Sequence, residues 1–234
     1  MSQLNFAAAL LAALPNDLQF AAHEPFSATA LVYAMLLSED PATQEAQLAG
    51  LASRVSPALY KEFMRLLPQI LEQPDKAKLP LIELSLPALR QLSPAQYEDF
   101  KRNVKQLVAA DNRIDLFEFA LEKMLLRHLE PHFKPTPKRI VHYYSLRGLA
   151  DDCAVLLSAL AHAGHADAAE REGAFRTGGQ HLHLDVPLPF IALKDCTLDR
   201  LNTALNRLGQ SAPQCKKTFL EAAAQTVAYD GEIH

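Results

Sequence analysis

Three helix starts that contain proline constrain the fold of this chain more than any other feature of its sequence. Each pairs a side chain that can accept a hydrogen bond with a proline directly after it. They are Asp40-Pro41, Ser56-Pro57 and Ser93-Pro94. Asp and Ser are favoured at the N-cap of a helix, and proline suits the first helical position, where its missing N–H costs nothing. The pairs therefore predict helices that begin at residues 41, 57 and 94.

Apolar residues recur at intervals of three and four between and beyond these starts, as expected for amphipathic helices. Pro87 is expected to kink or split the helix that contains it. The predicted helices cover residues 3–14, 27–38, 41–53, 57–71, 79–91, 94–110, 115–130, 146–163, 197–208 and 212–228. The fold class predicted is therefore all-α, a multi-helix bundle.

A proline-rich tract predicts the division of the chain into two helical subdomains. Residues 130–139 contain Pro131, Pro135 and Pro137 among basic residues, and such a tract is not expected to continue a helix. We therefore expect an N-terminal bundle over 1–130, a linker over 131–138 and a second helical subdomain over 139–234. Two short pieces, 139–144 and 181–188, alternate like extended segments, which is too little for a sheet.

Composition excludes several classes of partner. The chain has 234 residues, of which 49% are hydrophobic, and a net charge of −4, which gives no general attraction for nucleic acid. The apolar run 4–14 is too short to cross a bilayer, so no direct membrane insertion is expected. The cysteines are odd in number and have no C-x-x-C spacing, which predicts three buried thiols: Cys153, Cys196 and Cys215.

Two histidine motifs were considered as metal sites. His23-Glu24 begins like the zinc-peptidase pattern H-E-x-x-H, but Ser27 stands in place of the second histidine and Pro25 would disrupt the helix. We therefore expect a turn before a helix there.

The second motif follows two glycines. If residues 181–188 form a strand, His181, His183 and Asp185 share one face, which could bind a metal. The alternative is a polar strand face, or a loop that packs its leucines inward.

An acidic corner between two helices is the most informative segment. Asp115 and Glu118 have the spacing of a capping box, and Asp111 lies in the turn before them. Residues 227–233 repeat the pattern.

The three acidic residues could also bind calcium or magnesium, although Arg113 occupies a place that an EF-hand loop gives to a ligand. Three apolar residues lie close together after this corner and cannot all face one way on a helix: Leu116, Phe117 and Phe119. Either one of them faces outward, or the helix is covered on two faces and all three are buried in the core.

The corner, V-A-A-D-N-R-I-D-L-F-E-F-A-L over residues 108–121, resembles the helical domain of the tellurite-resistance TerB type. Together with A-A-H-E-P-F at 21–26, L-P-A-L-R-Q-L-S-P-A-Q-Y at 86–97 and L-L-R-H-L at 125–129, it resembles the C-terminal region of bacterial membrane-anchored HtpX-like zinc metallopeptidases. That resemblance implies a parent protein whose zinc helix and membrane spans lie upstream, on the cytoplasmic side of the inner membrane. The second corner stops at His234, which is expected if the chain is cut there.

The resemblance implies a non-catalytic regulatory or protein-interaction region. Its expected partners are the protease domain of the parent, a second copy of itself, or client proteins. We expect no catalytic residue and no cofactor in this chain, with zinc confined to the absent catalytic domain. Two alternatives stay open: a divalent-metal or small-ligand sensor that uses Asp111, Asp115 and Glu118, and an autonomous hydrolase that depends on His181 or His183.

Overall fold

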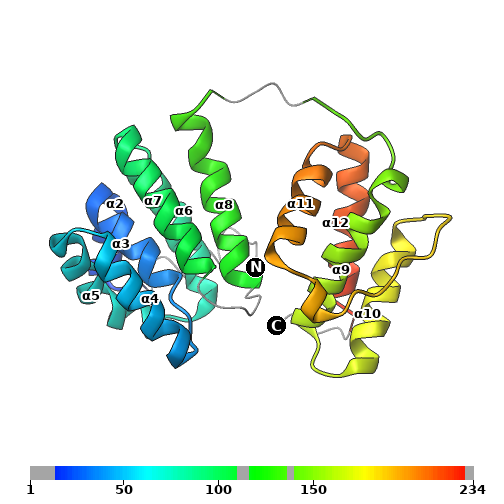
Figure 1. The fold of residues 1–234 in the computed structure, drawn as a ribbon, viewed down its shortest axis with the longest axis horizontal. Helices are drawn as coiled ribbons and strands as arrows, with labels where there is room; N and C mark the ends of the chain where they lie inside the picture. The colour runs from blue at the N-terminus through cyan, green and yellow to red at the C-terminus, as the bar shows by residue number, and fades with distance from the viewer. Residues whose placement is uncertain (1–13, 110–115, 136–139, 230–234) are drawn as a thin grey trace. The chain divides into compact units, whose positions relative to one another are not determined.

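The computed structural model describes residues 14–109, 116–135 and 140–229, and these contain eleven α-helices and no strand (Figure 1). Helices and 3-10 turns make up 77% of the described residues, so the all-α prediction is confirmed. The chain divides into two compact units, Met1–Thr136 (unit 1) and Pro137–His234 (unit 2). The predicted helix 3–14 and the second acidic corner lie outside the described residues.

Unit 1 is arranged around one helix that is buried on all sides. This helix, α3, contacts α2, α5, α6 and α7, and its residues 28–35 are all buried. The described helices are α2 (Asn16–His23), α3 (Pro25–Met35), α4 (Pro41–Arg54), α5 (Pro57–Leu71), α6 (Asp75–Leu89), α7 (Pro94–Val108) and α8 (Leu116–Phe133). A helix without a polar face needs neighbours all round, which the surrounding helices provide.

All three proline-containing helix starts form as predicted. Asp40 accepts a hydrogen bond from the Thr43 amide at 2.9 Å, and the Ser56 side chain accepts one from the Leu59 amide in the helix that begins at Pro57. Ser93 and Gln96 form a reciprocal capping box. The expected turn after His23 is also present, because α2 ends at that residue and α3 begins at Pro25.

A buried glutamine joins three helices of unit 1. Gln47 in α4 is 2% exposed, and its Nε2 donates to the carbonyl oxygens of Leu36, at 3.2 Å, and Leu107, at 2.8 Å. Its Oε1 accepts from the Ser38 amide at 2.8 Å. Backbone groups at the ends of α3 and α7 are thereby satisfied by one side chain, which is what buried polar groups require.

Unit 2 is arranged around α9, which contacts the three other α-helices of the unit. Its elements are the 3-10 turn η1 (Leu146–Leu149), α9 (Ala150–Gly164), α10 (Ala168–His181), the 3-10 turn η2 (Leu193–Asp195), α11 (Leu198–Gly209) and α12 (Pro213–Val227). Residues 153–159 of α9 are all buried. All three cysteines of the chain lie in this unit, buried and unpaired as predicted.

Several boundaries differ from the prediction. The linker was expected to begin at Pro131, but α8 continues to Phe133, whose ring stacks on Tyr97 with centroids 4.1 Å apart. A proline in the last turn removes one hydrogen bond, and this aromatic contact holds the turn in place. Pro87 was expected to kink or split its helix, and α6 stays one helix across Pro80 and Pro87, so the split does not occur.

Two helices were not predicted, α2 and α10. The segments expected to be extended form no strand in the described part of the chain: one isolated bridge joins Tyr143 to Ser211, and His181 is the last residue of α10. His183, with a φ of 50°, turns the chain after that helix. The predicted alternation over 181–188 therefore fails at its first residues.

Candidate functional site

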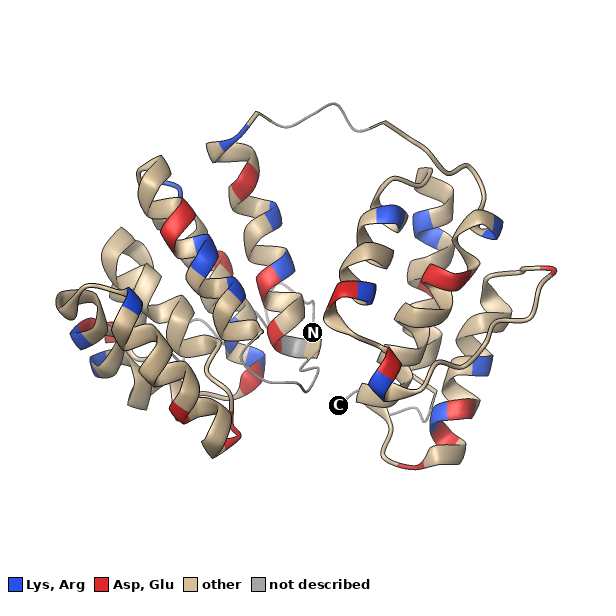
Figure 2. Cartoon of the chain, in the orientation of Figure 1, with Lys and Arg blue, Asp and Glu red and all other residues tan. Residues whose placement is uncertain are grey.

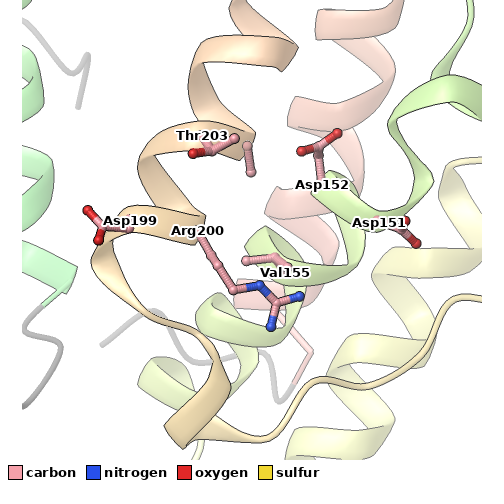
Figure 3. Close-up of a pocket in the computed structure, with 7 residues that line it drawn as sticks. Asp151, Asp152, Val155, Asp199, Arg200 and Thr203 are labelled. Atoms are coloured by element: carbon pink, nitrogen blue, oxygen red, sulfur yellow. The ribbon is translucent and has the colours of Figure 1, made fainter.

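Two hollows of unit 2 are candidate sites, and the first lies between α9 and α11. It has a volume of about 280 Å³, and three of its seven lining residues are acidic. Figure 3 shows that the carboxylates of Asp151, Asp152 and Asp199 point in different directions and not towards a common centre. A cation site needs oxygen ligands that converge within about 2.6 Å of one point. These carboxylates therefore do not form one.

Two charged residues that line the first hollow, Asp152 and Arg200, are engaged in contacts within unit 2. Asp152, whose side chain is 8% exposed, forms an ion pair with Arg207 of α11 at 2.9 Å. Arg207 also donates to the Tyr143 hydroxyl at 3.0 Å and to the Gly148 carbonyl oxygen at 3.3 Å. Arg200 donates to the carbonyl oxygen of Asp195. Asp152 and Arg200 of the first hollow thus stabilise the packing of unit 2.

Burial and charge act in opposite directions on Asp152. Removal of its carboxylate from water raises its pKa, the Arg207 guanidinium opposes that rise, and the neighbouring Asp151 adds to it. The net result is a raised pKa, so burial outweighs the ion pair. Such a carboxylate lowers the stability of unit 2 when it is ionised.

The second hollow, which we call the α10 groove, lies between α10 and the segment 184–190 and has a volume of about 430 Å³. Residues from α10 line one side: Glu172, Phe175, Arg176, Gly179 and Gln180. Residues from the segment line the other: Leu184, Val186, Pro187, Leu188 and Phe190. Apolar lining with a few polar groups at this volume is typical of ligand and peptide sites.

Local sequence explains the shape of the groove. Asp167 caps α10 by accepting from the Ala169 amide at 2.8 Å, which fixes where the helix begins. Pro187 and Pro189 favour an extended backbone and cannot join a helix here. The Leu188 side chain lies over Gly179, with its Cδ1 at 3.6 Å from where a Cβ would stand, an ordinary van der Waals distance.

The far end of the segment is anchored to α9 through Ile191. The Ile191 amide donates to the buried Ser158 hydroxyl at 2.9 Å, and its carbonyl oxygen lies 2.9 Å from Nε2 of His162. Because a carbonyl only accepts, His162 carries its proton on Nε2. The ring of Phe190 packs against both His162 and Phe175, with centroids 4.8 and 5.1 Å away. The groove wall is therefore held in place by contacts from two helices.

Two opposite charges stand at the rim of the groove, one helical turn apart. Glu172 and Arg176 are both exposed, and within the described ranges neither forms an ion pair or a side-chain hydrogen bond. Val186 is 37% exposed at the opposite wall. An apolar surface flanked by uncompensated charges of both signs is suited to a protein partner with the complementary arrangement.

The residues predicted as metal ligands are not brought together. His181, His183 and Asp185 are all exposed, and the strand that was to align them does not form. Asp111 and Asp115 lie outside the described residues, and Glu118 is half-buried in the first turn of α8. In the described ranges no three His, Cys, Asp or Glu side chains are grouped as metal ligands would be.

Known protein families, curated proteins and solved structures give no match to this chain. Across the described residues, no helix combines the length and the apolar character that crossing a bilayer requires. The α10 groove was not predicted from the sequence, although two signals for it exist. Glu172 and Arg176 have the i,i+4 spacing of a helix face, and V-P-L-P-F at 186–190 is an apolar extended pattern.

Proposed function

We propose that this chain is a non-catalytic helical protein-interaction region and that the α10 groove is its contact surface. The observation that carries the proposal is the groove itself, in which an apolar lining lies beside Glu172 and Arg176, two exposed charges without ion pairs among the described residues. A partner segment that buries Val186 and supplies the opposite charges gains both apolar contact and orientation.

The resemblance of residues 108–121 and their neighbours to HtpX-like metallopeptidases supplies the finer part of the proposal. The region regulates a membrane-associated zinc metallopeptidase on the cytoplasmic side of the inner membrane, and the zinc belongs to the parent's catalytic domain. Its partners are that protease domain, a second copy of the chain, or client proteins. The chain itself contributes binding and no bond cleavage.

Co-purification with matched surface variants tests the proposal. The tagged chain is incubated with detergent-solubilised membranes of the source cell, and chelator-sensitive peptidase activity is measured in the eluate. We expect the native chain to retain this activity and Val186→Asp to lose it, because a charge in the groove disfavours apolar contact. Leu205→Asp is the matched control, since Leu205 in α11 is also 37% exposed and lies outside the groove.

Two results would overturn the proposal. One is an eluate without chelator-sensitive peptidase activity for the native chain. The other is that Val186→Asp and Leu205→Asp retain equal chelator-sensitive peptidase activity in the eluate. An immunoblot of the membrane fraction adds a separate check on the parent protein. A band well above the 25.8 kDa of this chain is expected if the chain is the C-terminal region of a longer polypeptide.

A further inference from the structure

One face of α10 is not covered by the other helices of unit 2. The helix packs against α9 and α12, and its opposite side carries Ala169, Glu172, Arg176 and Gly179. Successive members of this set are three, four and three positions apart in the sequence, so they lie along a single stripe of the helix surface. Ala169, Glu172 and Arg176 are exposed, and Gly179 is half-exposed at the floor of the α10 groove. Acidic and basic positions follow each other along this helix in Figure 2.

This stripe is complementary to itself. When two identical helices pack antiparallel, positions at equal distances from a central residue face each other. Centred on residue 174, Glu172 of one copy faces Arg176 of the other, and the same register brings Ala169 opposite Gly179. Opposite charges therefore meet twice near the centre, and Ala169 of each copy meets Gly179 of the other at the two ends, where the Leu188 side chain lies beside the contact. A single antiparallel register therefore pairs all four positions of one copy with the same four positions of the other.

We infer that the α10 groove binds a second copy of this chain, with the two α10 helices antiparallel about a twofold axis. This inference rests on the proposed function, because it names the partner of the same groove. In the dimer, Glu172 and Arg176 of each copy form ion pairs with Arg176 and Glu172 of the other. Val186 lies against the partner's α10 and loses its exposure to water. The contact closes on itself, so assembly stops at two copies.

The size of the contact sets the expected affinity. One helix and one extended segment from each copy form an interface at the low end of the range for specific complexes. Dissociation constants of weak interfaces of this kind are about 1–100 µM. Because the central contacts are ion pairs near the surface, the dimer is expected to weaken as ionic strength rises.

Charge reversal in the full chain tests the inference by sedimentation velocity. The native chain is measured from about 1 to 200 µM, a range that brackets the expected dissociation constant. Its mass should rise from 25.8 kDa towards twice that value. Glu172→Arg places two arginines opposite each other, and Arg176→Glu places two glutamates opposite each other. Each variant alone should bind itself at least about tenfold more weakly than the native chain.

Mixing the two variants gives the decisive measurement. In a mixed dimer every arginine faces a glutamate, so an equimolar mixture should dimerise at concentrations where neither variant does so alone. The doubly reversed chain, Glu172→Arg with Arg176→Glu, should also regain the dimer. The matched control is the exposed i,i+4 pair of Lys217 and Glu221 in α12, 3.8 Å apart, where the same reversals should leave the dimer unchanged.

The inference is overturned if the native chain stays monomeric over the whole range, or if dimerisation is indifferent to reversal at 172 and 176. These results are distinguishable from failure of the proposed function. A monomeric chain that still retains peptidase activity, and loses it in Val186→Asp, rejects only the second copy as the partner. A monomeric chain that retains no activity rejects the α10 groove as a contact surface altogether.

Discussion

Gly178 in α10 and Thr226 in α12 are so close that a Cβ on Gly178 would lie 1.9 Å from the Thr226 hydroxyl oxygen. The same Cβ would lie 2.8 Å from the carbonyl oxygen of Ala222, which is backbone and cannot rotate away. Thr226 is fully buried and donates to that carbonyl at 3.1 Å. The close packing of α10 on α12, and with it the position of the α10 groove, therefore depends on the absence of a side chain at residue 178.

Gly178→Ala should destabilise unit 2. Alanine favours a helix over glycine by up to about 1 kcal/mol, but a methyl group forced into a packed contact costs about 1–3 kcal/mol, so overpacking wins. We expect a net loss of about 1–2 kcal/mol and a fall in Tm of about 5–10 °C for a unit of this size. Thermal unfolding followed by circular dichroism measures it.

Gly209 provides the matched control for this substitution. It ends α11, and a Cβ there would meet nothing within 4 Å. Gly209→Ala should therefore leave stability unchanged or raise it by up to about 1 kcal/mol. Gly173 is intermediate, because the atom that obstructs its Cβ is the hydroxyl of Tyr229, a residue 42% exposed that can rotate. Equal effects of all three substitutions would refute the packing argument.

These glycines explain why α10 was not predicted from the sequence. Gly173, Gly178 and Gly179 read as helix breakers, whereas in the structure Gly178 allows close packing on α12 and Gly173 lies against Tyr229, just after that helix. That role depends on residues about 50 positions later in the chain. The start of α10 could have been recognised, since Asp167 is an ordinary N-cap residue.

The three proline-containing helix starts were predicted correctly because their signals are local. An N-cap and a first-turn proline act within four residues of each other, so sequence alone is sufficient. The α10 groove depends instead on distant contacts, such as Ser158 to Ile191 and Phe175 to Phe190. Spacing in the sequence does not encode such contacts. The sequence therefore predicted an extended segment, as a strand or a loop, and did not predict the groove.

Gln47→Ala should destabilise unit 1 more than most buried polar substitutions. It leaves three backbone groups without their partner: the Ser38 amide and the carbonyl oxygens of Leu36 and Leu107. Each unsatisfied buried group costs about 1–3 kcal/mol, and partial hydration reduces the sum, so we expect a loss of about 2–4 kcal/mol. Gln44→Ala is the control, because Gln44 is half-exposed and makes one 3.3 Å bond to Ser38. A loss below that of Gln44→Ala would contradict the role of Gln47.

Asp152 and Glu62 should affect the pH dependence of stability in opposite directions. Burial raises the pKa of Asp152 above its ordinary 3.8, so the folded state binds more protons and the contribution of Asp152 to stability falls as the pH rises through that window. Hydrogen bonds from Arg65 and Ser27 lower the pKa of Glu62 below its ordinary 4.5, so its contribution is lost as the pH falls.

Urea unfolding between about pH 3 and 7 separates the two contributions, since both ordinary values lie within this range. Relative to the native chain, Asp152→Asn should become more stable as the pH rises above 3.8. Glu62→Gln should become less stable as the pH rises towards 4.5 and then stay constant. Parallel curves for the two variants would show that neither carboxylate is perturbed in the assigned direction.

Ser158→Ala should release the wall of the α10 groove while the helices stay folded. The substitution leaves the Ile191 amide without its acceptor and should cost about 1–2 kcal/mol. Hydrogen exchange at residues 184–192 should accelerate far more than exchange in α9. Ser53→Ala is the control, because the exposed Ser53 hydroxyl bonds only within its own turn. Unchanged exchange in Ser158→Ala would mean that Ile191 does not anchor the segment.

Divalent cations should leave the Tm of the full chain unchanged. His181, His183 and Asp185 are exposed and not aligned on a strand, so a cation would have to order them at an entropic cost. A ligand at a hundredfold excess over its dissociation constant adds about 2.7 kcal/mol, a shift of several degrees. Scans with about 5 mM calcium or magnesium, above the weakest dissociation constants of protein calcium sites, are therefore sensitive enough.

A rise in Tm that is abolished by Asp111→Asn with Asp115→Asn would establish the sensor alternative in place of the interaction region. A parallel scan with zinc tests the histidines, and a rise in Tm that is lost in His181→Ala would identify a histidine site.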